Sequence, residues 1–238
     1  MLRSEKSLKG YRIHAKDGEI GRVHDFLADD ALWFVRYMVV DTGSLIPRRK
    51  VLISPQMLDD PDGAREIFPV ERTIKQIKES PEIDTAMPVS RQHHQEALAF
   101  GLMATTPWPV TAADPVSTVI RAEEEPDVVR LRSLNELRGY VATARDGTIG
   151  RIRDFILDSD EWLIRYVVVD MGTLFAGRKV LLPVGWLLDV SWAERTAHFD
   201  IDKSRVQGAP VYEPTQPVNR SYELRVYDYY GRPRYWER

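Results

Sequence analysis

The sequence contains no cysteine, and this absence removes several kinds of chemistry at once. Disulfide bonds, thiolate zinc sites, iron–sulfur clusters and cysteine nucleophiles are all excluded. An excess of charge of either sign is also missing, because 33 Lys and Arg residues face 36 Asp and Glu residues, for a formal net charge of −3. A nearly neutral chain lacks the broad positive field of a general nucleic-acid coat. We therefore do not expect nucleic acid as a partner.

Long hydrophobic runs are absent as well. The longest apolar stretches cover residues 32–40 and 162–169, and each contains an arginine, Arg36 or Arg165. Each stretch is shorter than half of the about 20 apolar residues that a membrane-spanning helix needs. The chain starts with MLRSEKSLKGYR, which has none of the apolar core of an export signal. We expect a cytoplasmic protein without a membrane span.

Catalytic signatures are missing too. No G-x-x-x-x-G-K-[ST], G-x-S-x-G or H-E-x-x-H pattern occurs. Acidic pairs such as Asp29-Asp30 fall at predicted turns, where Asp accepts local backbone hydrogen bonds. The histidines, His14 and His24 among them, are predicted to lie on the surface without converging as metal ligands. We expect no catalytic residue, no bound metal and no cofactor, and therefore a protein that is not an enzyme.

What the sequence does contain is a duplication. The segment that starts at Leu2 repeats from Leu131, at a constant offset of 129 and without a gap over 51 positions. About half of these positions are identical, and the period is too long for a solenoid unit, so the chain holds two copies of one domain. Identical positions are most simply fold residues, whereas a single functional site would appear as a polar cluster in one copy only. The shared residues include Gly10/Gly139, Asp17/Asp146, Gly18/Gly147, Gly21/Gly150, Phe26/Phe155, Trp33/Trp162, Arg36/Arg165, Tyr37/Tyr166, Asp41/Asp170 and Gly43/Gly172.

The segment between the copies has a different composition. Residues 102–130 are rich in Pro, Ala and Thr and contain three consecutive glutamates, which is typical of a linker. The predicted division is a first domain with an extension over residues 1–101, the linker, and a second domain with an aromatic C-terminal tail over residues 131–238.

Each copy has the pattern of a small β domain. Residues 11–16 alternate apolar and polar side chains, and the following Asp17-Gly18 favours a hairpin turn. The next strand is predicted to bulge at Gly21, and residues 34–40 form a central strand that is apolar on both faces. Closely spaced strands indicate a small barrel or sandwich, with a short helix over residues 73–79. The predicted core contains Phe26, Trp33, Tyr37, Val39, Phe155, Trp162, Tyr166 and Val168.

Three stretches of each copy resemble the PRC-barrel domain. They are KGYRIHAKDGEIGRVHDFLADD, VRYMVVDTG and RRKVLIS in the first copy, and RGYVATARDGTIGRIRDFILDSD, RYVVVDMG and RKVLLP in the second, where the likeness is closer. The resemblance implies a mainly β fold, with two small PRC-type β-barrels in tandem, short helices and extended C-terminal extensions.

The resemblance also implies a role. The family is known from the cytoplasmic part of the photosynthetic reaction centre H subunit and from a ribosome maturation factor. It implies a non-enzymatic binding or assembly adaptor that acts through protein–protein contacts. The alternatives are a ribosome- or RNA-linked maturation factor and an H-subunit-like component of photosynthetic electron-transfer complexes. The protein partner is unknown, and self-association or pseudo-symmetric pairing of the two barrels within the chain is expected.

The C-terminal tail is the candidate partner-binding segment. Aromatic and arginine side chains are enriched in protein–protein contacts, but they also suit a tail that folds back on its own barrel. The candidate residues are Tyr222, Tyr227, Tyr229, Tyr230, Arg232, Arg234, Tyr235 and Trp236.

Two arginines inside apolar strands need partners as well. A buried arginine requires an opposite charge, so we expect structural ion pairs or contacts with an anion or partner. The expected ion pairs join Arg36 to Asp25 or Asp41, and Arg165 to Asp154 or Asp170.

Overall fold

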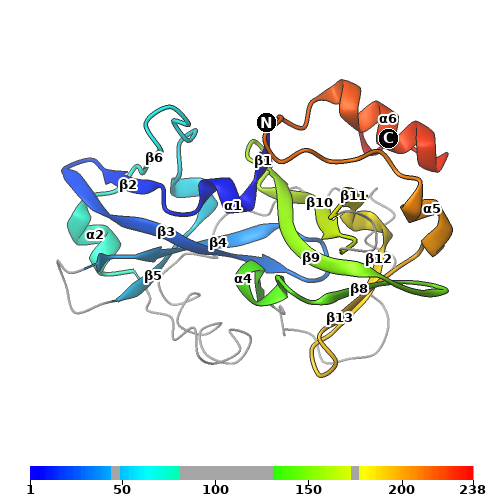
Figure 1. Cartoon of the computed structure of the whole chain (residues 1–238). Coiled ribbons are helices and arrows are strands. Elements are labelled where there is room, and N and C mark those ends of the chain that lie inside the picture. The colour runs from blue at the N-terminus through cyan, green and yellow to red at the C-terminus, as the bar shows by residue number, and fades with distance from the viewer. Residues whose placement is uncertain (44–48, 81–130, 173–176, 238) are drawn as a thin grey trace, which may run out of the picture.

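Two mixed β-sheets make up most of the molecule (Figure 1). The computed structural model describes residues 1–43, 49–80, 131–172 and 177–237. The predicted linker and residues 81–101, with His93 and His94, lie outside the described residues. No helix of the described residues is long and apolar enough to cross a membrane. The mainly β fold with short helices is confirmed.

The described part of the first repeat contains six strands and short helices. They are β1 (Leu2–Ser4), α1 (Glu5–Leu8), β2 (Arg12–Ala15), β3 (Gly18–Asp29), β4 (Val35–Asp41), β5 (Lys50–Ile53), the 3-10 helix η2 (Pro55–Met57), β6 (Ile67–Pro69) and α2 (Ile74–Lys78).

Within the described residues, the second repeat follows the same order and contains one more strand, and it continues into a C-terminal tail. Its elements are β7 (Leu131–Ser133), α4 (Leu134–Leu137), β8 (Val141–Ala144), β9 (Gly147–Asp158), β10 (Leu163–Asp170), β11 (Lys179–Pro183), η6 (Val184–Trp186), β12 (Leu187–Ser191), β13 (Thr196–Phe199) and α5 (Lys203–Gln207). The tail forms α6 (Arg220–Tyr230) and η7 (Tyr235–Glu237). The 129-residue offset persists as far as α2 and α5, so the structural repeat outlasts the clear sequence likeness.

Glycine determines the path of β3 beside β4. The pairing of β2 with β3 skips one residue next to Gly21, which confirms the bulged strand that the sequence predicted. A Cβ atom at Gly21 would overlap the carbonyl oxygen of Asp41. Gly150 has the same close approach to Asp170 in the second repeat. Only a residue without a side chain fits where the two strands cross so closely.

The two repeats exchange their first strands. β1 pairs with β9 of the second repeat, with Leu2 opposite Asp158. β7 pairs in turn with β3 of the first repeat, with Leu131 opposite Asp29. In Figure 1, β1 lies beside β9, although these strands are far apart in the sequence. Each sheet is therefore completed by a strand from the other repeat, in the reciprocal manner of a symmetric dimer.

Backbone hydrogen bonds link the repeats at a second place. The Val35 amide donates to the carbonyl of Trp162 at 2.7 Å, and the Ile164 amide donates to the carbonyl of Trp33 at 2.9 Å. The two bonds are equivalent under the 129-residue offset. Both tryptophans have a positive φ, 63° for Trp33 and 53° for Trp162, so the same unusual turn occurs twice at the contact. The repeats are thus joined around a pseudo-two-fold axis.

The main hydrophobic core runs through both repeats. Seven of the eight predicted core residues are buried, and Trp162 is partly buried. The Trp162 ring packs 6.2 Å from Phe26 and 6.1 Å from Phe68, both in the first repeat. Trp162 therefore contributes its apolar area to the core of the opposite repeat.

Candidate functional site

Two buried carboxylates hold the exchanged segments. Asp154 on β9 accepts a hydrogen bond from the Ser4 hydroxyl at 2.5 Å, and from the amide two residues further along at 3.0 Å. Asp25 on β3 accepts the equivalent bonds from the Ser133 hydroxyl at 2.5 Å and from a second amide at 3.1 Å. Burial raises the pKa of the Asp25 carboxyl, and these hydrogen bonds oppose the rise. Each carboxylate therefore fixes the first helical turn of the opposite repeat.

The predicted ion pair of Arg36 is wrong in its partner. Arg36 Nε lies 2.8 Å from Asp29 rather than beside Asp25 or Asp41. The reason is register, because β4 begins opposite the end of β3, where Asp29 is located. Asp25 instead faces the exchanged segment, and Asp41 accepts the Gly43 amide at 2.9 Å.

The predicted ion pair of Arg165 is wrong in the same way. Arg165 pairs with Glu161 and lies 3.7 Å from Asp158, which are at the same end of the β9–β10 pair. Asp154 is occupied by the exchanged segment. Asp170 accepts the adjacent loop amide at 2.8 Å and lies 3.3 Å from a surface arginine.

The exchanged segments, β1 with α1 and β7 with α4, form the boundary between the repeats, which we call the seam. The centre of the seam is not symmetric. Glu5 on α1 is completely buried and forms an ion pair with Arg138 after α4. Glu5 Oε1 has no hydrogen-bond partner, and burial raises the pKa of this carboxyl to about 7. The equivalent position in the second repeat is Leu134, which is also buried. The first repeat thus has a carboxylic acid at a position where the second repeat has an aliphatic side chain.

The tail aromatics are packed on their own repeat. The helix α6 is capped by Asn219 at its start and by a left-handed Gly231 at its end. Tyr222, Tyr227 and Tyr230 are buried, so the alternative in which the tail folds back is confirmed for these three residues. Figure 1 shows α6 lying over the second repeat, beside β10 and β11.

A buried carboxylate anchors the tail. Glu223 is almost fully buried and accepts hydrogen bonds from the Tyr166 hydroxyl at 2.7 Å and the Tyr235 hydroxyl at 2.8 Å. Arg220 completes the arrangement at 3.0 Å, and its guanidinium lies 4.0 Å above the Trp236 ring. Tyr235 and Trp236 therefore already have contacts with other residues of the tail.

The remaining tail candidates lie near the surface. Arg232 binds Asp200, and Arg234 lies 2.6 Å from Asp228. Tyr229 is 37% exposed, although its hydroxyl donates to the Arg205 carbonyl at 2.8 Å. Tyr229 is the one predicted aromatic that keeps a large exposed area.

The histidines within the described residues stay apart. His14 is exposed on β2, His24 is half-buried on β3, and His198 contacts the hydroxyls of Thr143 and Thr196 at 2.8 and 3.0 Å. Within the described ranges, no group of three or more His, Cys, Asp or Glu side chains is arranged to hold a metal ion.

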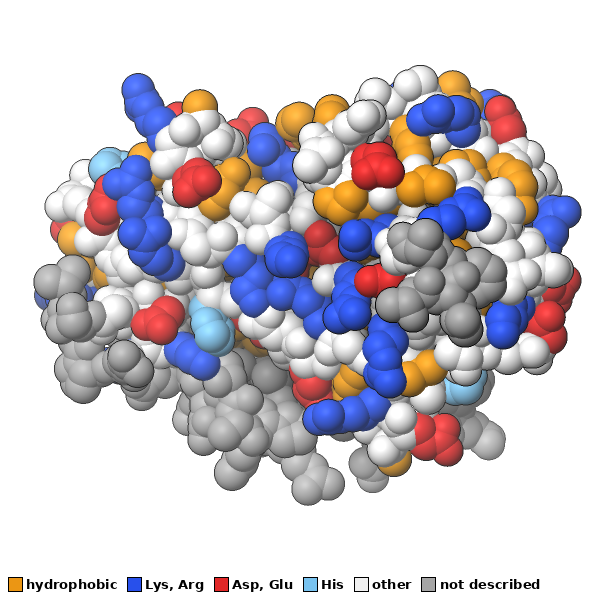
Figure 2. Space-filling model, viewed as in Figure 1, with side chains coloured by type: hydrophobic (Ala, Val, Ile, Leu, Met, Phe, Trp, Pro, Cys, Tyr) orange, Lys and Arg blue, Asp and Glu red, His pale blue; other side chains and the backbone are white. Residues whose placement is uncertain are grey.

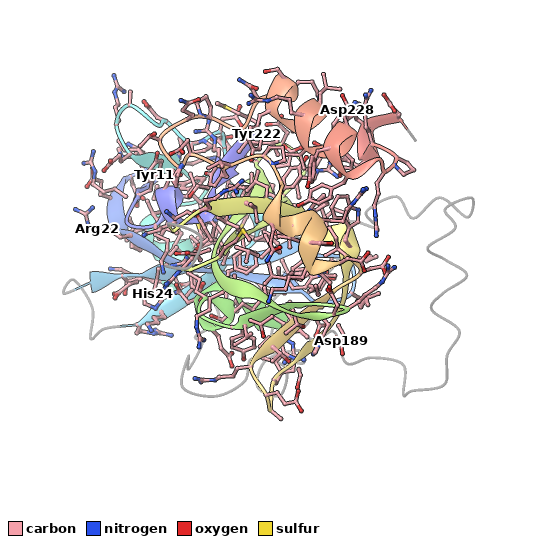
Figure 3. The ribbon with its side chains drawn as sticks, turned by 45° about the vertical axis from the view of Figure 1, so that its right-hand side comes forward. Tyr11, Arg22, His24, Asp189, Tyr222 and Asp228 are labelled. Atoms are coloured by element: carbon pink, nitrogen blue, oxygen red, sulfur yellow. The ribbon has the colours of Figure 1, made fainter. Side chains whose placement is uncertain are left out.

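A cavity in the first repeat gathers polar residues that the sequence did not group into a site. It has a volume of about 690 Å³ and lies on the outer side of β2, β3 and β4. Its lining consists of Gly10, Arg12, Glu19, Gly21, Arg22, Val23, His24, Asp41, Thr42 and Gly43. Figure 3 shows Arg22 and His24 along the same edge of the molecule. The available signal was the difference between the copies, because Arg12, Glu19, His24 and Thr42 have no identical counterparts.

Basic side chains connect this cavity to the seam. Arg22 donates to the Gly10 carbonyl at 3.0 Å, beside Lys9, whose ammonium contacts Asn135. On the other side, Arg151 makes the equivalent bond of 2.9 Å to the carbonyl of the residue after Arg138. Figure 2 shows Lys and Arg side chains gathering across the middle of this face, over α1, α4 and β9. The face around the seam therefore carries positive charge, although the whole chain does not.

Comparison with known proteins bears on the second repeat. Residues 130–206 match the family model of the PRC-barrel domain. No curated protein matches the chain at a significant level. The matched residues extend from β7 to α5, and the first repeat has a similar sheet without a family match of its own. The chain therefore contains one PRC-barrel domain, over residues 130–206, next to a first repeat of similar architecture.

Proposed function

We propose that the protein is a non-enzymatic binding scaffold, in which two PRC-type repeats act together as one unit on a protein partner. The proposal includes the division into residues 1–101, a linker over 102–130, and residues 131–238. The repeats contribute a fixed surface rather than reacting groups.

The observation that carries the proposal is the reciprocal exchange of β1 and β7. Exchange makes each sheet depend on the other repeat, so the outer surfaces of the two repeats keep one relative position. Buried polar groups are used for internal contacts: Asp25 and Asp154 hold the seam, and Glu223 holds the tail. A fixed arrangement of two similar surfaces suits recognition of a partner that touches both.

The experiment is affinity capture from native lysate with chemical cross-linking, using the full chain. We expect a specific protein to cross-link to residues of both repeats. The Asp25→Ala/Asp154→Ala double variant should retain β structure by circular dichroism but bind this protein at least about tenfold more weakly. The matched control is Asp59→Ala/Asp60→Ala, two exposed carboxylates outside the seam, which should bind normally.

Two results would overturn the proposal. One is a partner that the seam variant binds as tightly as the unmodified chain does. The other is the absence of any specific partner together with turnover of a small molecule.

A further inference from the structure

The cavity of the first repeat contains an arginine that is held in place but not neutralised. Arg12 on β2, Arg22 on β3 and Asp41 on β4 are cross-strand neighbours in one row. The Arg22 guanidinium is fixed by the Gly10 carbonyl at 3.0 Å. Within the described residues, no carboxylate lies within ion-pair distance of Arg22. A fixed guanidinium with unused N–H donors is suited to a planar oxyanion, because two parallel N–H groups match two oxygens.

The neighbouring groups favour an anion, rather than a cation, as the ligand of this cavity. Arg12 is 2.5 Å from Glu19 and also donates to a backbone carbonyl, so Glu19 is already paired. Asp41 accepts the Gly43 amide. The carboxylates of the lining thus have partners, whereas Arg22 has donors left over.

His24 adds a polar group that can orient a ligand. It lies two residues after Arg22 on β3, at an irregularity in the pairing with β4, and it is half-buried and lines the same cavity. Burial lowers the pKa of His24, and the cations of Lys50 and Lys9 lower it further, whereas Asp25 and Asp41 oppose the change. A neutral imidazole close to several cations acts as a hydrogen-bonding group rather than as an extra charge.

The second repeat shows which of these features the fold itself requires. The second repeat keeps the anchored arginine as Arg151 and the acid of the row as Asp170. It also keeps the three glycines of the cavity, as Gly139, Gly150 and Gly172. The other polar positions of the cavity are changed: Arg12 becomes Val141, Glu19 becomes Thr148, His24 becomes Arg153 and Thr42 becomes Met171. In the second repeat the acid of the row is also paired with Arg153 at 3.3 Å. The four changed polar positions are therefore specific to the first copy, as expected of a site, whereas the anchored arginine and the acid are common to both copies.

We propose that this cavity binds a small molecule through its carboxylate or phosphate group, with Arg22 holding the oxyanion and His24 orienting the ligand. A volume of about 690 Å³ lies within the range of small-molecule sites. The site does not depend on the scaffold role, because it needs only the first repeat's own strands and the adjoining turn at Gly10.

The test is an NMR titration of the full chain with inorganic phosphate and, separately, with succinate. We expect saturable shifts of the His24 imidazole and the Arg22 side chain with at least one probe, and the tighter probe identifies the group that the site prefers. Arg22→Gln should raise the dissociation constant at least about tenfold. Arg151→Gln removes an equally exposed arginine with the same backbone anchor, and should leave the constant within about twofold.

A second variant guards against an effect of Arg22 on folding. His24→Ala leaves Arg22 and its backbone anchor in place and removes the orienting imidazole without adding a charge, so it should also weaken binding at least about tenfold. The absence of saturable shifts up to about 50 mM of both probes would overturn the proposal. Equal losses from Arg22→Gln and Arg151→Gln would also overturn it, since they would show general attraction to positive charge.

Discussion

The first and second repeats share the order of their described strands and helices, apart from the additional β12, but differ in several residues around them. Both use a glycine where β3 meets β4 or β9 meets β10, a positive-φ tryptophan, and an aspartate that holds an exchanged segment. They differ in the acid at Glu5 and in the polar cavity around Arg22. The comparison teaches that the shared residues build the paired fold, whereas the differences are the places to look for function.

The fold residues that occupy equivalent positions should respond equally to mutation. Phe26 and Phe155 are both fully buried. Phe155→Ala and Phe26→Ala should each lower the free energy of unfolding by about 3–5 kcal/mol, because each leaves a cavity in a shared core. Chemical denaturation measures the change. A loss within about 0.5 kcal/mol at either position would show that this side chain is not in the core.

The tail should stabilise the second repeat. Tyr227→Ala removes a buried ring that packs on Tyr166, Trp186 and Trp236, and should lower the free energy of unfolding by about 2–4 kcal/mol. The matched variant is Tyr229→Ala, at a more exposed position of the same helix, with an expected loss under about 1 kcal/mol. Similar melting temperatures for the two variants would contradict the packing of α6.

The two seam carboxylates should contribute similar amounts. Asp25→Ala and Asp154→Ala each leave a half-buried serine hydroxyl and an amide without their acceptor, at a cost of about 1–3 kcal/mol. Hydrogen exchange should speed up in β7 for the first variant and in β1 for the second. Faster exchange in the segment of the same repeat as the mutation, rather than in the opposite one, would contradict the exchange.

The smallest effect should come from the asymmetric position of the seam. Because the pKa of Glu5 is raised to about 7 in the folded protein, the fold holds a proton that the unfolded chain releases above its ordinary carboxyl pKa. The contribution of Glu5 to stability therefore falls as the pH rises through this window to about 7.

Glu5→Leu copies the second repeat and should remove that slope. It should raise stability at pH 8 by about 1 kcal/mol, since Arg138 is partly exposed and can be solvated when its partner is lost. Urea denaturation from pH 5 to pH 8 measures both effects. An unchanged pH slope in the variant would show that another group is responsible.

Much of the fold was predictable because its causes are local. Alternation over residues 11–16 and the Asp17-Gly18 turn are visible in the sequence, and so is the duplication. The exchange was not predictable, because β1 and β7 share the sequence LRS, so either segment suits either repeat.

The sites were harder to predict for a different reason. The tail's composition is compatible with both partner binding and packing, and only the buried Glu223 with its two tyrosine hydroxyls separates the two. Arg36 was paired with the wrong aspartate because a register difference of a few residues changes which carboxylate is nearest. His24 was predicted as an ordinary surface residue because the cross-strand row beside it is not visible along the chain.

The most direct test of the central claim, the reciprocal exchange, is disulfide formation in a chain that has no cysteine of its own. Leu2→Cys/Asp158→Cys places two thiols on paired residues of β1 and β9. Leu2→Cys/Asp29→Cys places them where the strand would pair if each repeat kept its own segment. Under mild oxidation, we predict that the first variant forms an intrachain disulfide and the second remains reduced. A disulfide in the second variant and none in the first would contradict the exchange.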